Sequence, residues 1–264
     1  MKKYLGQHFL NNKKILEELV RAAEISKKDV VLEVGPGLGS LTEILAEHAG
    51  KVIAIEKDRE LVALLMKHKT LFKNKNIKII HGDILKPETW LSKVNASSFM
   101  LHASRFKIVA NIPYYITSRF LRLFLTQTRF RSKLMVLMVQ KEVAVRICAK
   151  PPHMNLLALS VQAYAKPEII RGVSKSQFFP PPKVDSAIIK MTPYPRSPFP
   201  LRKGKGVAEK ILQLARLAFQ QKRKMLRGSI GKKITLPEKY QSKRPEELSL
   251  KDWTEVIRNS RSAE

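Results

Sequence analysis

The sequence predicts an α/β fold, in which a mostly parallel sheet carries helices on both faces and a small helical domain follows at the C-terminus. Short β-branched runs alternate with segments whose apolar residues recur at helical spacing, and this alternation predicts the parallel sheet. A cluster of prolines then separates the alternating part from a basic tail with a helical pattern. The 264 residues, 44% of them hydrophobic, suffice for one core of ordinary domain size and a smaller appendage.

Strands are expected at short runs rich in β-branched residues, namely Val30–Val34, Val52–Ile55, Ile77–Ile80, Lys107–Ala110, Leu134–Val139 and Val184–Met191. Helices are expected where apolar residues recur at helical spacing, namely Leu41–His48, Arg59–Lys67, Ser118–Leu125, Glu142–Ala149 and Leu156–Ala165. Gly50 follows the first of these helices where a C-cap is expected, and Asp58 precedes the second where an N-cap is expected.

The prolines between Pro193 and Pro200 disfavour both a helix and a central strand, so this stretch is the expected linker. The expected domains are therefore residues 1–193 and residues 194–264. In the second domain, Val207–Leu226 has apolar residues at helical spacing. The segment from Ser249 to Asp252 resembles a capping box, which predicts a last helix that runs to Arg258.

The chain carries a net charge of +28, from 50 Lys and Arg against 22 Asp and Glu, and this excess indicates a polyanionic partner. Nucleic acid is the first candidate, and a membrane surface is the alternative. The sequence has no apolar run of about 18 residues and no strongly basic amphipathic face, which disfavours the membrane. The N-terminus lacks the apolar stretch of a secretory signal, so we expect a cytoplasmic protein.

Cysteine and histidine usage points away from disulfides and metals. The single cysteine, Cys148, excludes an internal disulfide, and its apolar neighbours predict a small buried side chain. The six histidines show no metal-ligand spacing, so no metal is expected.

A glycine-rich turn follows the expected strand Val30–Val34 and precedes a helix. Glycines at 35, 37 and 39 let the backbone approach a ligand closely and adopt conformations that other residues avoid. Such a turn is typical of a nucleotide site at the carboxyl edge of a sheet. A dinucleotide fingerprint places its third glycine one position later, so this spacing favours a cofactor without phosphates.

Acidic residues end the next two expected strands. Glu56 lies where a carboxylate can accept the hydrogens of both ribose hydroxyls, a feature that dinucleotide and S-adenosylmethionine sites share. Asp83, which precedes Ile84, is placed to accept a hydrogen bond from an adenine amino group. Each acid alone could be a solvated strand end, but together with the glycines they indicate one cofactor crevice.

The segment from Asn111 to Tyr114 follows the fourth expected strand and lies at the same edge as the glycine turn. An ordinary turn is the alternative, because Asn and Pro are common turn residues. An exocyclic adenine amine is a poor nucleophile, since its lone pair is delocalised into the ring. If the Asn111 side-chain oxygen and a backbone carbonyl of the motif accept its two hydrogens, a tetrahedral nitrogen is favoured and the lone pair is free to attack.

Aromatic residues are expected to hold the target base. Tyr114 is the candidate for stacking, an interaction that contributes about 1 to 3 kcal/mol per base. Phe178 begins a proline-rich stretch that ends at Ser186, and it is the candidate for a second ring that closes a sandwich. A core phenylalanine before an edge strand is the alternative interpretation of Phe178.

Together these residues resemble the ribosomal RNA adenine N6,N6-dimethyltransferase family over nearly the whole chain. The segments that carry the resemblance are Gly6–Leu10, Glu33–Thr42, Ile55–Asp58, Gly82–Ile84, Asn111–Thr117, Gln140–Val143, Phe178–Ser186 and Ala218–Arg227. The resemblance implies a Rossmann-like class I methyltransferase sheet with S-adenosylmethionine as the methyl donor. It further implies dimethylation of two adjacent adenosines near the 3′ end of 16S rRNA within a pre-30S particle. We expect no membrane partner and infer no obligate protein partner.

The resemblance also implies roles for individual residues. The residues implied to bind the cofactor are His8, Leu10, Gly35, Gly37, Glu56, Asp83, Ile84 and Asn111. Within this set, His8 and Leu10 close over the cofactor and Gly35 lies against its methionine part. Glu56 holds the ribose, and Asp83 with Ile84 frames the adenine. The residues implied to act on the target base are Asn111, Pro113, Tyr114 and Phe178.

Cations in the tail are candidates for contacts with RNA phosphates, and a solvated helix face is the alternative for each of them. These cations are Lys222, Arg223, Lys224 and Arg227. Competing functions are an RNA-binding factor without catalysis, a methyltransferase of large-subunit rRNA or DNA adenine, and a nicotinamide oxidoreductase. The intact Asn111, Pro113 and Tyr114 argue against a pure binder, and the basic tail favours a small-subunit target.

Overall fold

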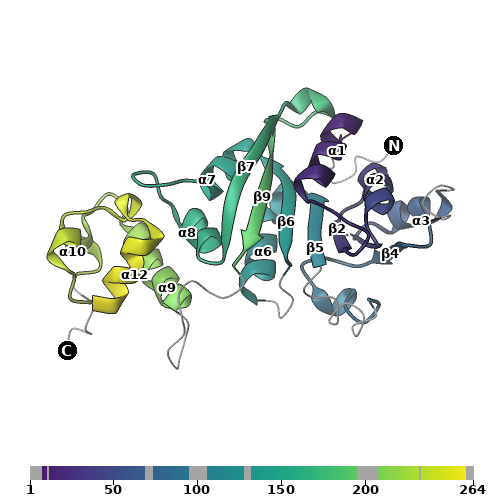
Figure 1. Cartoon of the computed structure of the whole chain (residues 1–264). Helices are drawn as coiled ribbons and strands as arrows, with labels where there is room; N and C mark the ends of the chain where they lie inside the picture. The colour runs from purple at the N-terminus through teal and green to yellow at the C-terminus, as the bar shows by residue number, and fades with distance from the viewer. Residues whose placement is uncertain are drawn as a thin grey trace. The chain divides into compact units, whose positions relative to one another are not determined.

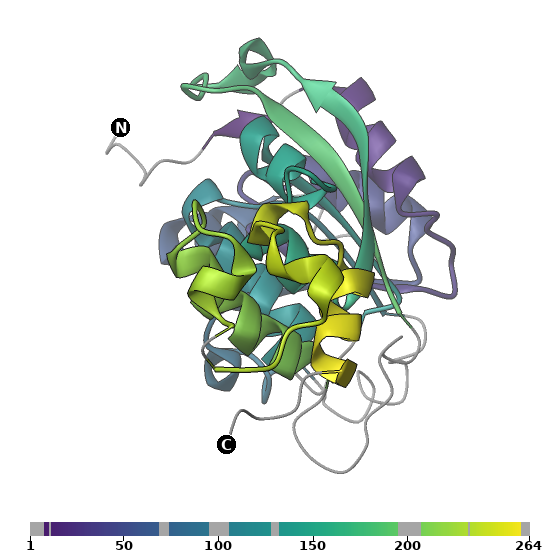
Figure 2. The same ribbon diagram turned by 90° about the vertical axis from the view of Figure 1, so that its left-hand side faces the viewer.

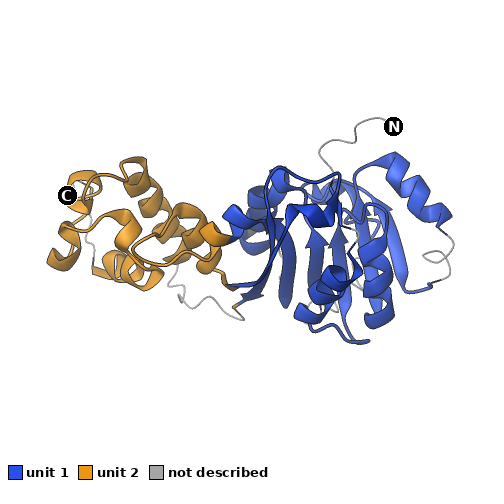
Figure 3. Cartoon of the chain, turned by 90° about the horizontal axis from the view of Figure 1, so that it is seen from above, with its two compact units in different colours: residues 1–144, 168–193 blue, residues 145–167, 194–264 orange. Residues whose placement is uncertain are grey.

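The computed structural model describes residues 8–10, 12–68, 74–94, 106–127, 132–194, 207–231 and 233–259. The chain forms two compact units, one of residues 1–144 and 168–193 and the other of residues 145–167 and 194–264 (Figure 3). One break falls where the domain boundary is expected, but residues 145–167 group with the second unit, whereas we expected them in the first. Of the expected linker, only Pro193 and Tyr194 lie among the described residues.

A seven-stranded sheet in the order β4-β3-β2-β5-β6-β9-β7 forms the centre of the first unit (Figure 1). Its strands are β2 (Val30–Val34), β3 (Lys51–Glu56), β4 (Ile77–His81), β5 (Phe106–Asn111), β6 (Leu134–Gln140), β7 (Ala165–Val173) and β9 (Ser186–Pro193). The strands from β4 to β6 are parallel and β9 is antiparallel to β6, which confirms the mostly parallel α/β prediction. Chain order reverses at β2, between β3 and β5, and such a switch point opens a crevice beyond the carboxyl ends of the strands.

The helices that connect these strands begin within one residue of the predicted positions. They are α2 (Ser40–His48), α3 (Arg59–Lys67), α6 (Thr117–Arg122) and α7 (Lys141–Ile147). Asp58 caps α3 as expected, because its carboxylate accepts hydrogen bonds from the first-turn N–H groups of Glu60 and Leu61. Gly50 has a different role from the predicted C-cap: a Cβ at this position would lie 2.2 Å from the Lys27 carbonyl oxygen, so only glycine allows this close approach.

Helix α1 (Lys13–Ala22) and strand β7 are among the elements that were not predicted. Helix α1 buries Ile15, Leu16, Leu19 and Val20, whose helical spacing is a signal that sequence reasoning could have used. Strand β7 carries mostly exposed residues in its middle, so it lacks the apolar alternation that marks a strand.

A separate two-stranded sheet joins the N-terminal segment to the proline-rich stretch. In it, β1 (Phe9–Leu10) runs antiparallel to β8 (Phe178–Phe179), and Phe9 pairs with Phe179 and Leu10 with Phe178. No local pattern predicts a pairing between segments so far apart in the chain.

The central strands β2, β3, β5 and β6 are buried on both faces. Helices flank the sheet on both sides (Figure 3). Val31 and Val109 pack with buried residues of α1 and α2 in one core. Their neighbours Leu32 and Ile108 point to the opposite face and are fully buried as well. Burial on both faces explains the continuous apolar runs that predicted these strands.

The second unit is helical, and Figure 2 shows its helices gathered around one another. They are α8 (Leu156–Gln162), α9 (Val207–Gln220), α10 (Leu226–Ser229), α11 (Glu238–Gln241) and α12 (Leu250–Asn259). Ala158 and Leu159 of α8 pack in one core with Trp253 of α12, which explains why residues 145–167 belong to this unit. The predicted capping box of α12 is confirmed, since Ser249 N–H donates to the Asp252 carboxylate at 2.8 Å and Asp252 N–H donates to the Ser249 hydroxyl at 3.2 Å.

Within the described ranges, every helix is too short or too polar to cross a membrane.

Candidate active site

A cavity of about 850 Å³ opens at the carboxyl ends of β2, β3, β4 and β5. All of the residues predicted to bind the cofactor line it, and these are His8, Leu10, Gly35, Gly37, Glu56, Asp83, Ile84 and Asn111. Pro113 and Tyr114 line it as well. The structure therefore brings the predicted cofactor crevice and most of the predicted target motif to one place.

The glycine turn forms one wall of the cavity in a conformation that favours glycine. Gly35, Gly37 and Gly39 have φ angles of +64°, +59° and +91°. A Cβ at Gly37 would lie 3.0 Å from the ring of Phe9, so a side chain there would press on the β1 segment. The turn is held in place by the Gly35 N–H, which donates to the Ile55 carbonyl at 2.9 Å. The result is a fixed turn of backbone beside the cavity.

Glu56 ends β3 with its carboxylate turned back onto the backbone. One carboxylate oxygen accepts from the N–H groups of Lys57 at 2.8 Å and Asp58 at 2.9 Å, and the other accepts from the Gly37 N–H at 3.4 Å. Burial raises the pKa of this carboxyl above its ordinary value, and the three N–H donors act against that rise. These bonds fix the orientation of Glu56 at the cavity wall.

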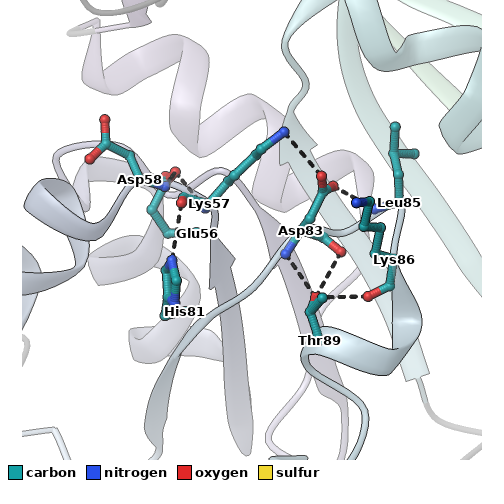
Figure 4. A network of polar contacts seen from close by, with 8 residues as sticks. All are labelled: Glu56, Lys57, Asp58, His81, Asp83, Leu85, Lys86 and Thr89. Carbon is teal, nitrogen blue, oxygen red and sulfur yellow. Dashed lines mark hydrogen bonds and ion pairs between the residues drawn. The ribbon is translucent and has the colours of Figure 1, made fainter.

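Asp83 follows β4 and pairs with a residue that sequence reasoning did not assign. Its Oδ2 lies 3.0 Å from the Lys57 ammonium, and its Oδ1 accepts from the Leu85 N–H at 3.0 Å (Figure 4). Burial acts to raise the pKa of the Asp83 carboxyl, but the hydrogen bond and charge of Lys57, with the Leu85 N–H, hold it below the ordinary value. Asp83 is therefore ionised at neutral pH and accepts hydrogen bonds only.

Glu33, the fourth residue of β2, is a second group without a predicted role. It lines the cavity, is 1% exposed, and its Oε2 has no hydrogen-bond partner in the described part of the chain. Burial raises the pKa of the Glu33 carboxyl to about 8, and the negative charge of Glu56 adds to the rise. A buried polar atom without a partner is costly, and a bound polar ligand would satisfy it.

Asn111 ends β5 with its side chain held by the N-terminal segment. Its Nδ2 donates to the His8 carbonyl at 3.3 Å, and its Oδ1 has no hydrogen-bond partner among the residues that the structure describes. The His8 ring is fixed in turn, because its Nδ1 donates to the Pro180 carbonyl at 2.7 Å. The amide is thus oriented so that its oxygen is available as an acceptor.

Tyr114 lies next to Asn111 in the cavity wall. Its hydroxyl forms a 2.7 Å hydrogen bond with the Ser186 hydroxyl, and burial raises the pKa of the phenol above its ordinary value. The His8 ring stacks near it, with a centroid distance of 6.1 Å and an interplanar angle of 27°. Ser186 ends the proline-rich stretch, and its hydrogen bond with Tyr114 links that stretch to the motif.

The structure does not bring Phe178 to the cavity. Its side chain is 4% exposed and packs in the core that contains Leu10 and α1. The neighbouring Phe179 is 69% exposed and points away from that core. The position of Phe178 corresponds to the alternative interpretation, a core phenylalanine, because β8 pairs with β1 and turns this residue inward.

The predicted RNA-contacting cations lie in the second unit, in and before α10. All four of these side chains are exposed, namely Lys222, Arg223, Lys224 and Arg227. Gly6 and Gln7 of the predicted motifs lie outside the described residues.

A switch-point cavity, a glycine turn spaced for a cofactor without phosphates and acids at the next two strand ends define a class I methyltransferase that uses S-adenosylmethionine. The glycine turn in the cavity wall and the unpaired Glu33 oxygen fit a donor with a polar methionine part. The chain belongs to the ribosomal RNA adenine dimethylase family, whose model matches residues 1–257.

Individual relatives agree with this membership. The ribosomal RNA small subunit methyltransferase A of Dehalococcoides mccartyi (strain CBDB1) is 39% identical over 270 residues, which cover 97% of this chain and 87% of that protein. The protein of the same name from Moorella thermoacetica is 40% identical over 235 residues, covering 87% of this chain and 78% of that protein.

Solved structures show the same fold. A dimethyladenosine transferase from Plasmodium falciparum superposes with a TM-score of 0.76 at 28% identity, covering 95% of this chain and 96% of that chain. The 23S rRNA methyltransferase ErmE has a TM-score of 0.71 at 23% identity, covering 95% of this chain and 100% of that chain, and it shares the fold.

Proposed function

We propose that this chain methylates N6 of two adjacent adenosines near the 3′ end of 16S rRNA, twice per base, within an assembling 30S particle in the cytoplasm. Membership of the rRNA adenine dimethylase family supports the chemistry, and the name of the small-subunit relatives supports the target. The observation that carries the proposal is the orientation of Asn111, whose side-chain oxygen is available in the same cavity as the cofactor residues.

The donor is proposed to occupy the wall formed by the glycine turn and the strand-end acids. The Glu56 carboxylate, oriented by three N–H groups, accepts the ribose hydroxyls, and Asp83 accepts the adenine amino group beside Ile84. Gly35 lies against the methionine part, which His8 and Leu10 cover. This arrangement leaves the Asn111 side of the cavity for the target base.

S-adenosylmethionine, when bound, supplies an electrophilic methyl group on a sulfonium. The Asn111 oxygen and the Pro113 carbonyl are proposed to accept the two hydrogens of the target amine, which favours a tetrahedral nitrogen with a free lone pair. The Pro113 carbonyl already accepts from the Ile116 N–H at 3.1 Å, and its second lone pair is available for the amine. No strong base is needed before attack, because the proton leaves a cationic amine afterwards.

Tyr114 is proposed to stack on the target base, since its hydroxyl is fixed by Ser186 and its ring lines the cavity. The proposed second ring, Phe178, is buried in the core in this structure, so a sandwich requires β8 to move when RNA binds. The exposed cations from Lys222 to Arg227 are proposed to contact RNA phosphates, which makes binding weaken as salt rises.

The proposal is tested by transfer of labelled methyl groups to 30S particles from a strain that lacks this modification. Matched reactions contain 50S particles or duplex DNA, and the labelled nucleoside is then mapped on 16S rRNA. We expect label on two adjacent adenosines of the 30S particle alone, recovered as N6,N6-dimethyladenosine. Label on 50S particles or DNA would identify a different target, and RNA binding without label would identify a binding factor.

A further inference from the structure

We propose that Lys57 is a positioning residue for Asp83: its ammonium holds the carboxylate in the orientation that selects a 6-aminopurine in the methyl donor and disfavours a 6-oxopurine. This inference rests on the proposed role of Asp83 in binding the adenine amino group. The inference adds a second residue, Lys57, from the end of the neighbouring strand. The proposed role of Asp83 does not by itself require this residue.

The geometry links two strand ends across the cofactor wall (Figure 4). Lys57 follows β3, and its backbone is fixed because its N–H donates to the Glu56 carboxylate at 2.8 Å. Its side chain reaches the end of β4, where the ammonium lies 3.0 Å from Asp83 Oδ2. Both residues line the cavity, so the ion pair lies at the surface that the donor contacts.

Asp83 is held by three contacts. Two of these contacts are to the carboxylate itself: Leu85 N–H donates to Oδ1 at 3.0 Å and Lys57 occupies one side of Oδ2. The third fixes the backbone, because the Asp83 N–H donates to the Thr89 hydroxyl at 2.9 Å. A carboxylate has about four lone-pair sites, so these contacts leave acceptor positions for one amino group. Without the Lys57 ammonium, Oδ2 of Asp83 is no longer held, and the carboxylate can rotate away from the amino group of the donor.

The charge of Lys57 also favours the ionised carboxylate. Burial acts to raise the pKa of Asp83, whereas the hydrogen bond and charge of Lys57, the Leu85 N–H and the charge of Lys86 lower it, so Asp83 is ionised at neutral pH and cannot donate a hydrogen bond. An acceptor-only group binds an amino group and repels a carbonyl oxygen at the same position. The Lys57 side chain is 68% exposed, so its removal leaves the packing of the core intact.

The test compares the affinities of S-adenosylhomocysteine and S-inosylhomocysteine, measured by calorimetry for the full-length protein without RNA. Lys57→Met keeps the aliphatic stem and removes the charge, Lys57→Arg keeps the charge, and Asp83→Asn removes the acceptor charge. Lys86→Met is the matched control, because Lys86 also lines the cavity and acts on Asp83 through its charge without pairing with it.

We expect Lys57→Met to weaken S-adenosylhomocysteine binding by about two- to fivefold, the range of a partly exposed ion pair. Binding of the 6-oxo ligand should change less, so the preference between the two ligands narrows. Lys57→Arg should retain most of the preference, and Lys86→Met should retain it within about twofold of the wild type.

Suppose that Asp83→Asn loses the preference for S-adenosylhomocysteine over S-inosylhomocysteine. The role of Lys57 is then overturned if Lys57→Met keeps that preference or binds S-adenosylhomocysteine more tightly than the wild type. An Asp83→Asn variant that keeps the preference would instead remove Asp83 from the adenine site, and the role of Lys57 with it. The two failures are therefore distinguishable, since only the second contradicts the proposed function of Asp83.

Discussion

Replacing Tyr114 by alanine tests whether its ring holds the target base. Stacking of a base on an aromatic side chain contributes about 1 to 3 kcal/mol, so Tyr114→Ala should lower kcat/KM for RNA about 5- to 150-fold. The affinity for S-adenosylhomocysteine should stay within about twofold, because the proposed donor contacts come from the glycine turn and the strand-end acids. Methyl transfer to 30S particles gives the first quantity and calorimetry the second.

Tyr114→Phe separates the ring from its hydroxyl. The hydroxyl contributes one hydrogen bond with Ser186, worth about 0.5 to 1.5 kcal/mol, so this variant should lose a similar free energy of unfolding and keep most of its activity. Ser186→Ala is the matched control, because it removes the same bond and leaves the ring. Equal loss of activity in Tyr114→Phe and Tyr114→Ala, or equal loss of donor affinity and transfer, would refute the stacking role.

Three further variants test other parts of the site. Glu56→Ala should weaken donor binding about 10- to 150-fold, from about 1.5 to 3 kcal/mol of charged hydrogen bonds, and unchanged affinity in calorimetry would remove Glu56 from the site. The raised pKa of Glu33 means that the folded protein loses stability as pH rises from 4.5 to about 8. Glu33→Gln should therefore become more stable relative to the wild type over that range. Parallel curves of Tm against pH for the two proteins would contradict the raised pKa of Glu33. Phe178→Ala should cost about 3 to 5 kcal/mol in urea unfolding and Phe179→Ala about 0.5 or less, while equal costs would contradict the burial of Phe178.

Local patterns predicted the central strands β2, β3, β5 and β6 well because these strands are buried on both faces. Val30–Val34 and Arg59–Lys67 have the same bounds in the structure as in the prediction, since a continuous apolar run and a clear N-cap mark them. Strand β7 was missed because most of its residues are exposed, and its period-two signal is therefore weak.

The residues of the site could be predicted from local sequence patterns, but their contact partners could not. Glycines and acids at successive strand ends predicted the cavity, because parallel strands bring their carboxyl ends to one edge. The partners of these residues could not be predicted, since Lys57 meets Asp83, His8 meets Asn111 and Ser186 meets Tyr114 only after the chain has folded.

The register of strand β8 against β1 decides whether the Phe178 ring faces the core or solvent. The pair Phe178 and Phe179 gives no local signal for which ring faces the core, because successive residues of a strand point to opposite sides. The pairing of β8 with β1 turns Phe178 toward the core, and β1 lies far away in the sequence, near the N-terminus.

The proposed mechanism depends on the Asn111 oxygen, which activates the target amine beside the bound donor. It is tested most directly by single-turnover methyl transfer to 30S particles by Asn111→Ala with the donor at saturating concentration. We predict a rate about 100- to 1000-fold lower than that of the wild type, the usual cost of removing one hydrogen bond made in the transition state. A rate within about tenfold of the wild type, with the donor bound, would contradict the claim.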